Sequence, residues 1–107
     1  MEITNYHTNK VFDVYGGRPT KGADPRTIKV GQYGWLGNPF KDADRTKNIS
    51  DYKQYFWKRV NEDVVFRNAV IELQDKVVCC FCAPKPCHLH VIQAWFDKGM
   101  PLRSEAQ

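Results

Sequence analysis

Apolar and polar residues alternate near the N-terminus of the chain, which is the pattern of a β-strand with one buried face. We expect one strand over 2–6, and after a short turn the alternation predicts a second strand over 11–15. Glycine and proline at 16–19 end the second strand because they break regular pairing. The stretch 22–37 that follows is rich in glycine and aromatic residues, and within it we expect a loop with a short strand over 27–30.

Helical periodicity takes over in the middle of the chain. Asn48 or Ser50 is the expected N-cap of a first helix and Asp63 that of a second, because such side chains accept hydrogen bonds from the free N–H groups of a first turn. The apolar face of these two helices consists of Tyr52, Tyr55, Phe56, Val60, Phe66, Ala69, Val70 and Leu73.

The C-terminal part predicts a buried strand followed by a helix. The apolar run at 76–82 suits a short strand, and the last helix should begin near Cys87. Gly99 stands where a left-handed residue closes a helix, and Pro101 prevents its continuation. The residues expected to be buried on this helix are Val91, Ile92, Trp95 and Phe96.

This order of elements predicts an α/β fold, a small single-domain sandwich with a short mixed sheet flanked by about three helices. The domain should span 1–103, with a short C-terminal tail at 104–107. A chain of 107 residues can bury one hydrophobic core without disulfides. Ligands in such folds bind where a strand, a tight loop and a helix N-terminus meet.

Composition narrows the class of protein further. Apolar residues make up 42% and charged residues 26% of the chain, which is ordinary globular composition and argues against disorder. No apolar run approaches the ~20 residues of a membrane helix, and residues 1–10 lack the apolar stretch of a signal peptide, so we expect a cytoplasmic protein that does not bind membranes. The net charge of +4 suits phosphate or nucleic acid, although the basic residues form no dense cluster.

Four cysteines fall within nine residues and two histidines follow them. In a cytoplasmic chain, this clustering favours metal binding or reactive thiols over disulfides. Because side chains alternate along a strand, Cys80 and Cys82 should share one face while Cys79 packs in the core.

Two kinds of chemistry, besides simple burial of the thiols, suit this cluster. In the first, Cys87 lies at a helix N-terminus, where the backbone N–H groups stabilise a thiolate and His88 exchanges a proton with it. The same N–H groups can hold a phosphate. In the second, zinc is bound by Cys80, Cys82, Cys87 and His88 or His90, although this spacing is tighter than the usual C-x₂-C knuckle.

Three motifs of this sequence resemble those of the domain of unknown function 4326 family, whose members occur in bacteria and phage genomes. They are Tyr15-Gly16-Gly17-Arg18-Pro19, then Leu36-Gly37-Asn38-Pro39-Phe40, then Cys80-Phe81-Cys82-Ala83-Pro84-Lys85-Pro86-Cys87-His88 with Val91-Ile92. The third motif is the most specific, and the resemblance spans about residues 11 to 97. It implies a compact α/β domain in which the motifs meet at one site, and a phage-encoded member would act in the host-cell cytoplasm.

The family resemblance also draws attention to the stretch 20–35, which is longer than the usual connection between the first two motifs. We expect this insertion to alter or cover the site. His7 and His90 carry no motif role and should be structural or exposed.

The polar motif residues have alternative uses. Arg18 offers a bidentate fork for phosphate or carboxylate, or forms a surface salt bridge. Asn38 holds a base edge or a ribose hydroxyl, or satisfies its own turn. Tyr33 and Trp35 can stack on a base, with core packing the favoured use of Trp35.

The leading hypothesis is a small ligand-binding protein, with or without catalysis, that acts on a nucleotide, nucleoside or related phosphorylated metabolite. Cys87 and His88 would supply the anion site or the catalytic pair, and Arg18, Asn38 and Cys82 would contact the ligand. The alternative is a zinc-stabilised, non-catalytic module that engages nucleic acid or a host protein. Against catalysis, the sequence shows no evident carboxylate base, phosphate loop or complete triad.

Overall fold

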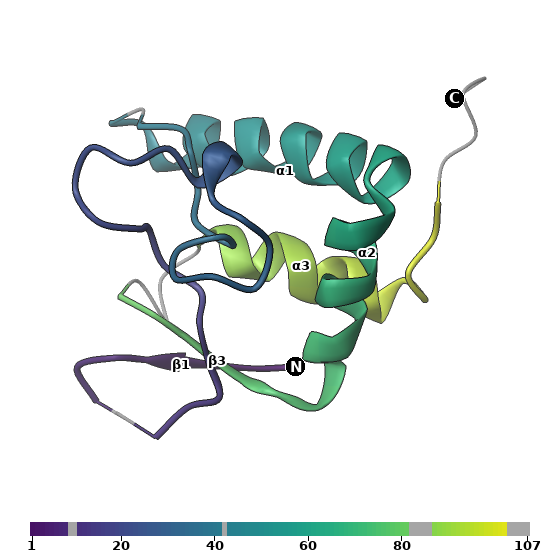
Figure 1. Ribbon diagram of the computed structural model, residues 1–107, viewed down its shortest axis with the longest axis horizontal. Helices are drawn as coiled ribbons and strands as arrows, with labels where there is room; N and C mark the ends of the chain where they lie inside the picture. The colour runs from purple at the N-terminus through teal and green to yellow at the C-terminus, as the bar shows by residue number, and fades with distance from the viewer. Residues whose placement is uncertain (9–10, 42, 82–86, 103–107) are drawn as a thin grey trace.

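A three-stranded sheet lies beneath a layer of helices in the computed structural model (Figure 1). The structure describes residues 1–8, 11–41, 43–81 and 87–102. The strands are β1 (Glu2–Asn5), β2 (Val14–Tyr15) and β3 (Val77–Cys80), and β3 occupies the centre of the sheet. Together with its helices this sheet confirms the expected small α/β fold.

All three strands are parallel, so the expectation of a mixed sheet is wrong. Glu2 pairs with Val77 at one end of the β1–β3 ladder, and Asn5 pairs with Cys80 at the other. On the opposite edge, Val14 pairs with Val78. Alternation along a strand identifies its buried face but not its partner or direction. The long connection through the first two helices brings β3 between the two N-terminal strands, as parallel pairing requires.

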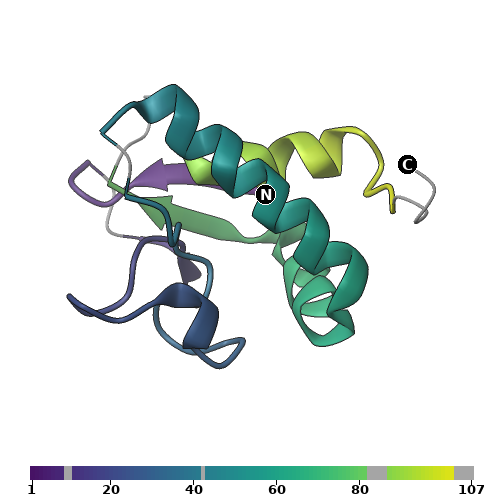
Figure 2. The same ribbon diagram turned by 90° about the horizontal axis from the view of Figure 1, so that it is seen from above.

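Three α-helices form the second layer, seen from above in Figure 2. They are α1 (Arg45–Glu62), α2 (Val64–Ile71) and α3 (His88–Asp97). Two 3₁₀ turns, Pro25–Thr27 and Glu72–Asp75, complete the regular structure of the described residues.

The observed start of α2 and end of α3 agree with the sequence-based predictions, and the observed start of α1 does not. Asp63 caps α2 by accepting from the Phe66 N–H at 3.1 Å, and Gly99 with φ of 87° follows the end of α3. The first helix begins earlier than expected, because Asp44 and not Asn48 or Ser50 is its N-cap. Its first turn is polar, so apolar spacing gave no sign of it.

The stretch 27–30 is not a strand. Asp24 accepts from the Arg26 N–H at 2.9 Å and caps the short 3₁₀ turn there. A side chain that satisfies the local backbone in this way competes with strand pairing.

The core lies between the helices and the sheet, and aromatic rings dominate it. Phe56 of α1 meets Trp95 of α3 edge to face at 5.6 Å between ring centroids. Trp35 is buried and meets Phe66 of α2 at 5.7 Å, so core packing is its use. The residues predicted to be buried are buried, apart from Tyr55, Ala69 and Phe96, which are half-buried. Among the described residues, no helix combines the length and apolar character needed to span a bilayer.

Candidate functional site

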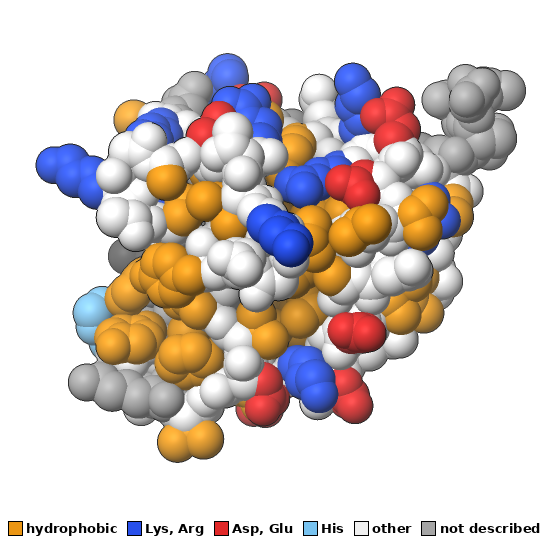
Figure 3. All heavy atoms as spheres, in the orientation of Figure 1, with side chains coloured by type: hydrophobic (Ala, Val, Ile, Leu, Met, Phe, Trp, Pro, Cys, Tyr) orange, Lys and Arg blue, Asp and Glu red, His pale blue; other side chains and the backbone are white. Residues whose placement is uncertain are grey.

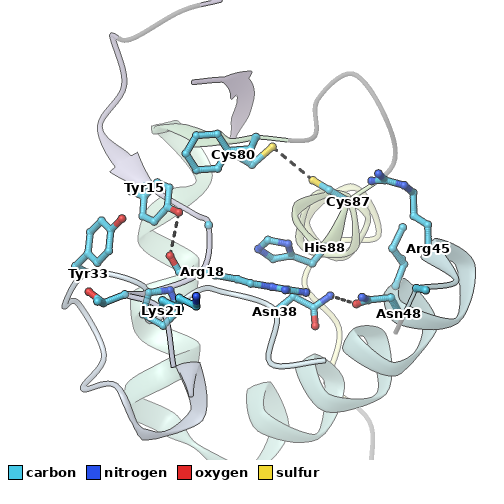
Figure 4. A pocket seen from close by; sticks show the side chains of 16 residues that line it. Tyr15, Arg18, Lys21, Tyr33, Asn38, Arg45, Asn48, Cys80, Cys87 and His88 are labelled. Atoms are coloured by element: carbon cyan, nitrogen blue, oxygen red, sulfur yellow. Dashed lines mark hydrogen bonds between the residues drawn. The ribbon is translucent and has the colours of Figure 1, made fainter. Parts of the chain in front are cut away.

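A pocket of about 710 Å³ opens where the ends of β2 and β3 face the beginnings of α1 and α3 (Figure 4). Tyr15 and Cys80 contribute from the strand ends, and Arg45 and His88 contribute from the helices. The carboxyl edge of a parallel sheet is the usual place for a ligand in α/β folds. The remaining described lining residues are Gly17, Arg18, Pro19, Thr20, Lys21, Tyr33, Asn38, Ala43, Asn48, Ile49, Phe81 and Cys87.

The three sequence motifs meet at this pocket through hydrogen bonds between distant residues. The Nε2 atom of His88 lies 2.7 Å from the Gly16 carbonyl oxygen, which joins the third motif to the first. The Arg18 guanidinium donates to the Phe40 carbonyl at 2.6 Å, which joins the first motif to the second. Arg18 therefore bonds to backbone, and within the described part of the chain it has no carboxylate partner. The salt-bridge interpretation of Arg18 does not hold there.

Gly16 has no side chain, which allows its backbone to lie close to both β3 and α3. A Cβ atom at this position would lie 2.7 Å from Cγ1 of Val78 and 2.9 Å from Cδ2 of Leu89. Such distances are well below ordinary carbon contact, so a larger residue would push the turn away from both the sheet and α3.

His88 is neutral and its tautomer is fixed by its surroundings. The residue is 8% exposed, and burial lowers its pKa to about 4. A carbonyl oxygen only accepts, so Nε2 must carry the hydrogen that it donates to Gly16. The Tyr52 ring packs edge-on against the imidazole at 4.9 Å. Through Nε2, His88 thus joins the third motif to the first, and this nitrogen is occupied by the Gly16 carbonyl.

Cys80 and Cys87 both line the pocket and point toward each other, with their sulfur atoms 3.7 Å apart (Figure 4). Both side chains are buried. Cys79 points to the other side of β3 and is fully buried, which raises its pKa and fits the predicted core role.

The predicted zinc set is only partly described. Cys82, expected both as a ligand contact and as a metal ligand, lies outside the described residues. Among those that are described, no three His, Cys, Asp or Glu side chains are placed to hold a metal ion. The exposed His90 accepts from the Cys87 N–H at 3.0 Å through Nδ1 and so caps the first turn of α3, which fits the structural role expected for it.

The side chain of Asn38 satisfies its own turn. The residue is 7% exposed, and its Oδ1 atom accepts from the Phe40 N–H at 2.9 Å. Its Nδ2 atom donates to Oδ1 of Asn48 in α1. These bonds are those of the turn interpretation, and they fix the second motif to the first helix.

A stacked pair of tyrosines forms another part of the pocket wall. The rings of Tyr15 and Tyr33 lie 4.7 Å apart and within 11° of parallel. The Tyr15 hydroxyl donates to the Arg18 carbonyl at 2.9 Å, and burial raises the Tyr15 pKa, so this ring remains neutral. Tyr33 is 63% exposed and lines the pocket.

Three cationic side chains line the pocket, namely Arg18, Lys21 and Arg45, and its described lining residues include no carboxylate. Figure 4 shows Arg18 reaching across the pocket toward Asn38. The insertion at 20–35 contributes Thr20, Lys21 and Tyr33, so it forms part of the wall.

Sequence reasoning missed five of the lining residues that bear on ligand chemistry. Tyr15 and Phe81 stand inside the first and third motifs, and that position was the available signal for them. Lys21, Arg45 and Asn48 are ordinary polar residues of a loop and a helix start, and nothing in the sequence marks them.

Fold and site together define a small parallel α/β protein with a basic, partly aromatic pocket at the carboxyl edge of its sheet. The family model described as Domain of unknown function (DUF4326) matches residues 8–98. The chain belongs to this family. No curated protein and no solved structure matches the chain.

Proposed function

We propose that the pocket binds a nucleotide or a closely related phosphorylated metabolite. One observation carries the proposal: a cluster of cations and a stacked pair of tyrosines line the same pocket, and its described lining residues include no carboxylate. The volume of about 710 Å³ lies within the ~300–1,000 Å³ typical of small-ligand sites.

The cationic side chains of the pocket are the expected contacts of the phosphate group. Arg18 and Arg45 present guanidinium groups, which bind phosphate oxygens in pairs of parallel hydrogen bonds, and Lys21 adds a point charge. The first turn of α3 begins at the same wall with His88. The N-terminal end of a helix carries partial positive charge and favours an anion nearby. Because His88 is neutral, this attraction comes from the helix and not from an imidazolium.

The base or another flat group belongs at the tyrosine side. Tyr33 exposes most of its ring, and the parallel Tyr15 ring behind it keeps that ring in place. An aromatic base gains stacking energy on such a ring whatever its identity. Asn38 also lines the pocket. Its amide already bonds to Phe40 and Asn48, and the second N–H and the second lone pair of that amide are what it would offer to the sugar or the edge of the base.

Calorimetric titration with nucleoside monophosphates tests this function. Lys21→Ala should weaken binding about tenfold or more, because a hydrogen bond to a charged group contributes about 1.5–3 kcal/mol. Lys58→Ala is the matched control, since it removes one positive charge from an exposed position of α1 outside the pocket. Wild-type protein that binds none of the monophosphates, or equal affinities of the two variants, would contradict the proposal.

The two sides of the pocket can be separated with a second substitution. Tyr33→Ala should weaken a nucleoside monophosphate by about 1–3 kcal/mol, the value of one base stacked on one ring. The same variant should bind inorganic phosphate as the wild type does. An equal loss for both probes would show that Tyr33 does not contact the base.

A further inference from the structure

Aromatic rings continue from the pocket onto the outer surface at the carboxyl edge of the sheet. Phe81 directly follows β3 and lines the pocket, and its ring lies 6.0 Å from that of Tyr15. On its other side, Phe81 contacts Tyr6 at 5.2 Å and His7 at 5.3 Å, both just after β1. Parallel strands end at the same edge, which is why rings from two distant segments come together here. We call Phe81, Tyr6 and His7 the aromatic shelf.

The shelf is open to solvent in a way that core aromatics are not. Phe81 is 48% exposed, His7 is exposed and Tyr6 is half-buried. In Figure 3, hydrophobic side chains gather at the lower left, over the end of the sheet. Single exposed apolar residues are ordinary on a protein surface, but a contiguous group of exposed rings next to a pocket is typical of an interaction site.

Charge decides which partner suits the shelf. The rings run outward from a pocket lined by Arg18, Lys21 and Arg45, and the chain as a whole carries a net charge of +4. Exposed rings beside cations provide the two contacts that single-stranded nucleic acid needs, stacking for its bases and positive charge for its phosphates. Paired bases in a duplex cannot stack on a side chain in this way.

We infer that the pocket holds one nucleotide of a single-stranded nucleic acid whose neighbouring bases stack on the aromatic shelf. The inference rests on the proposed nucleotide binding and extends it from a mononucleotide to a strand. The nucleotide in the pocket contacts the cations and Tyr33, and the strand leaves over Phe81 toward Tyr6 and His7. Strand binding should therefore be tighter than mononucleotide binding, and it should weaken more steeply with salt, because more phosphates are neutralised.

Fluorescence anisotropy with labelled deoxythymidine and uridine strands of about eight nucleotides tests this. Deoxythymidine and uridine monophosphate serve as the single-nucleotide probes. The variant Tyr6→Ala with His7→Ala should lose about tenfold in affinity for the strand and none for the monophosphate, since neither residue lines the pocket. The control is Val65→Ala, which truncates an exposed apolar residue of α2. If the double variant does not unfold cooperatively in urea, the single change His7→Ala replaces it, with a smaller loss expected.

The outcomes separate the inference from the function beneath it. A strand that binds no tighter than the monophosphate, or as tightly to the variant as to the wild type, overturns the inference and leaves nucleotide binding intact. If neither the strand nor the monophosphate binds, both the inference and the proposed nucleotide binding are overturned. If neither strand binds and the wild type is a dimer that the double variant breaks, the shelf is an interface between two copies and the inference is wrong.

Discussion

Acidification from pH 7 to pH 5 should destabilise this protein through His88. Burial lowers the pKa of His88 to about 4, and the positive charge of Arg18 acts in the same direction. The unfolded chain restores a pKa near 6.5. Between these two values the unfolded state binds more protons, so the stability contribution is complete above about pH 6.5 and is lost as the pH falls toward 4.

The size of the effect follows from the two pKa values. The full shift is equivalent to about 3 kcal/mol, of which about 2 kcal/mol disappears between pH 7 and pH 5. In a domain of this length, that loss lowers the melting temperature by about 10 °C. Structurally, protonation places a charge in a buried site between the Tyr52 ring and the Gly16 carbonyl.

Urea unfolding at pH 7, 6 and 5 measures the effect against His88→Gln. The glutamine amide keeps a donor for the Gly16 carbonyl but does not titrate in this range. The stability advantage of the wild type should therefore shrink by about 2 kcal/mol from pH 7 to pH 5. His7→Gln controls for the loss of an exposed imidazole. Parallel pH profiles of the wild type and His88→Gln would refute the assignment of His88 as a buried, neutral donor.

Two further predictions concern the loops that shape the pocket. Gly34→Ala should lower the free energy of unfolding in urea by at least about 2 kcal/mol more than Gly31→Ala does. Both residues have positive φ, but only at Gly34 would a Cβ atom collide with the backbone of Pro19. Equal unfolding midpoints of the two variants would contradict this. Asn38→Ala should lower the free energy of unfolding by about 2 kcal/mol, since it removes two hydrogen bonds. It should also accelerate hydrogen exchange of the Phe40 amide, and unchanged exchange would mean that the turn does not depend on this side chain.

The helices of this fold could be predicted from the sequence because their signals are local. Apolar spacing in α1 and the Asp63 cap of α2 are readable within a few residues. The strands carried weaker signals, and β2 has just two residues, Val14–Tyr15. Which strands pair, and in which direction, depends on contacts between residues far apart in the chain, and alternation does not encode them.

The candidate site was partly predictable because its motifs are also local signals in the sequence. Arg18, Asn38, Cys80, Cys87 and His88 were identified by their motifs, and all five line one pocket. Their individual bonds were not predictable, because each joins segments that only the folded chain brings together. The hydrogen bond of His88 to a carbonyl in the first motif, for example, gives this residue a positioning role that its place in the sequence did not indicate.

Exposed cations were the hardest part of the site to foresee. In sequence, Lys21 and Arg45 look like any other surface residue of a loop or a helix start. They line the pocket because the insertion at 20–35 and the first turn of α1 border it. A lining of this kind becomes visible only when the fold has placed the segments.

The central claim, that a nucleotide occupies this pocket, is tested most directly by titrating ¹⁵N-labelled protein with a nucleoside monophosphate and following the amide resonances. The account predicts saturable shifts at Gly17, Lys21, Tyr33 and His88, with the amide of Val65 on α2 unmoved. Inorganic phosphate should shift Lys21 and His88 but leave Tyr33 in place. Absence of shifts at saturating ligand, or shifts centred on another part of the surface, would contradict the claim.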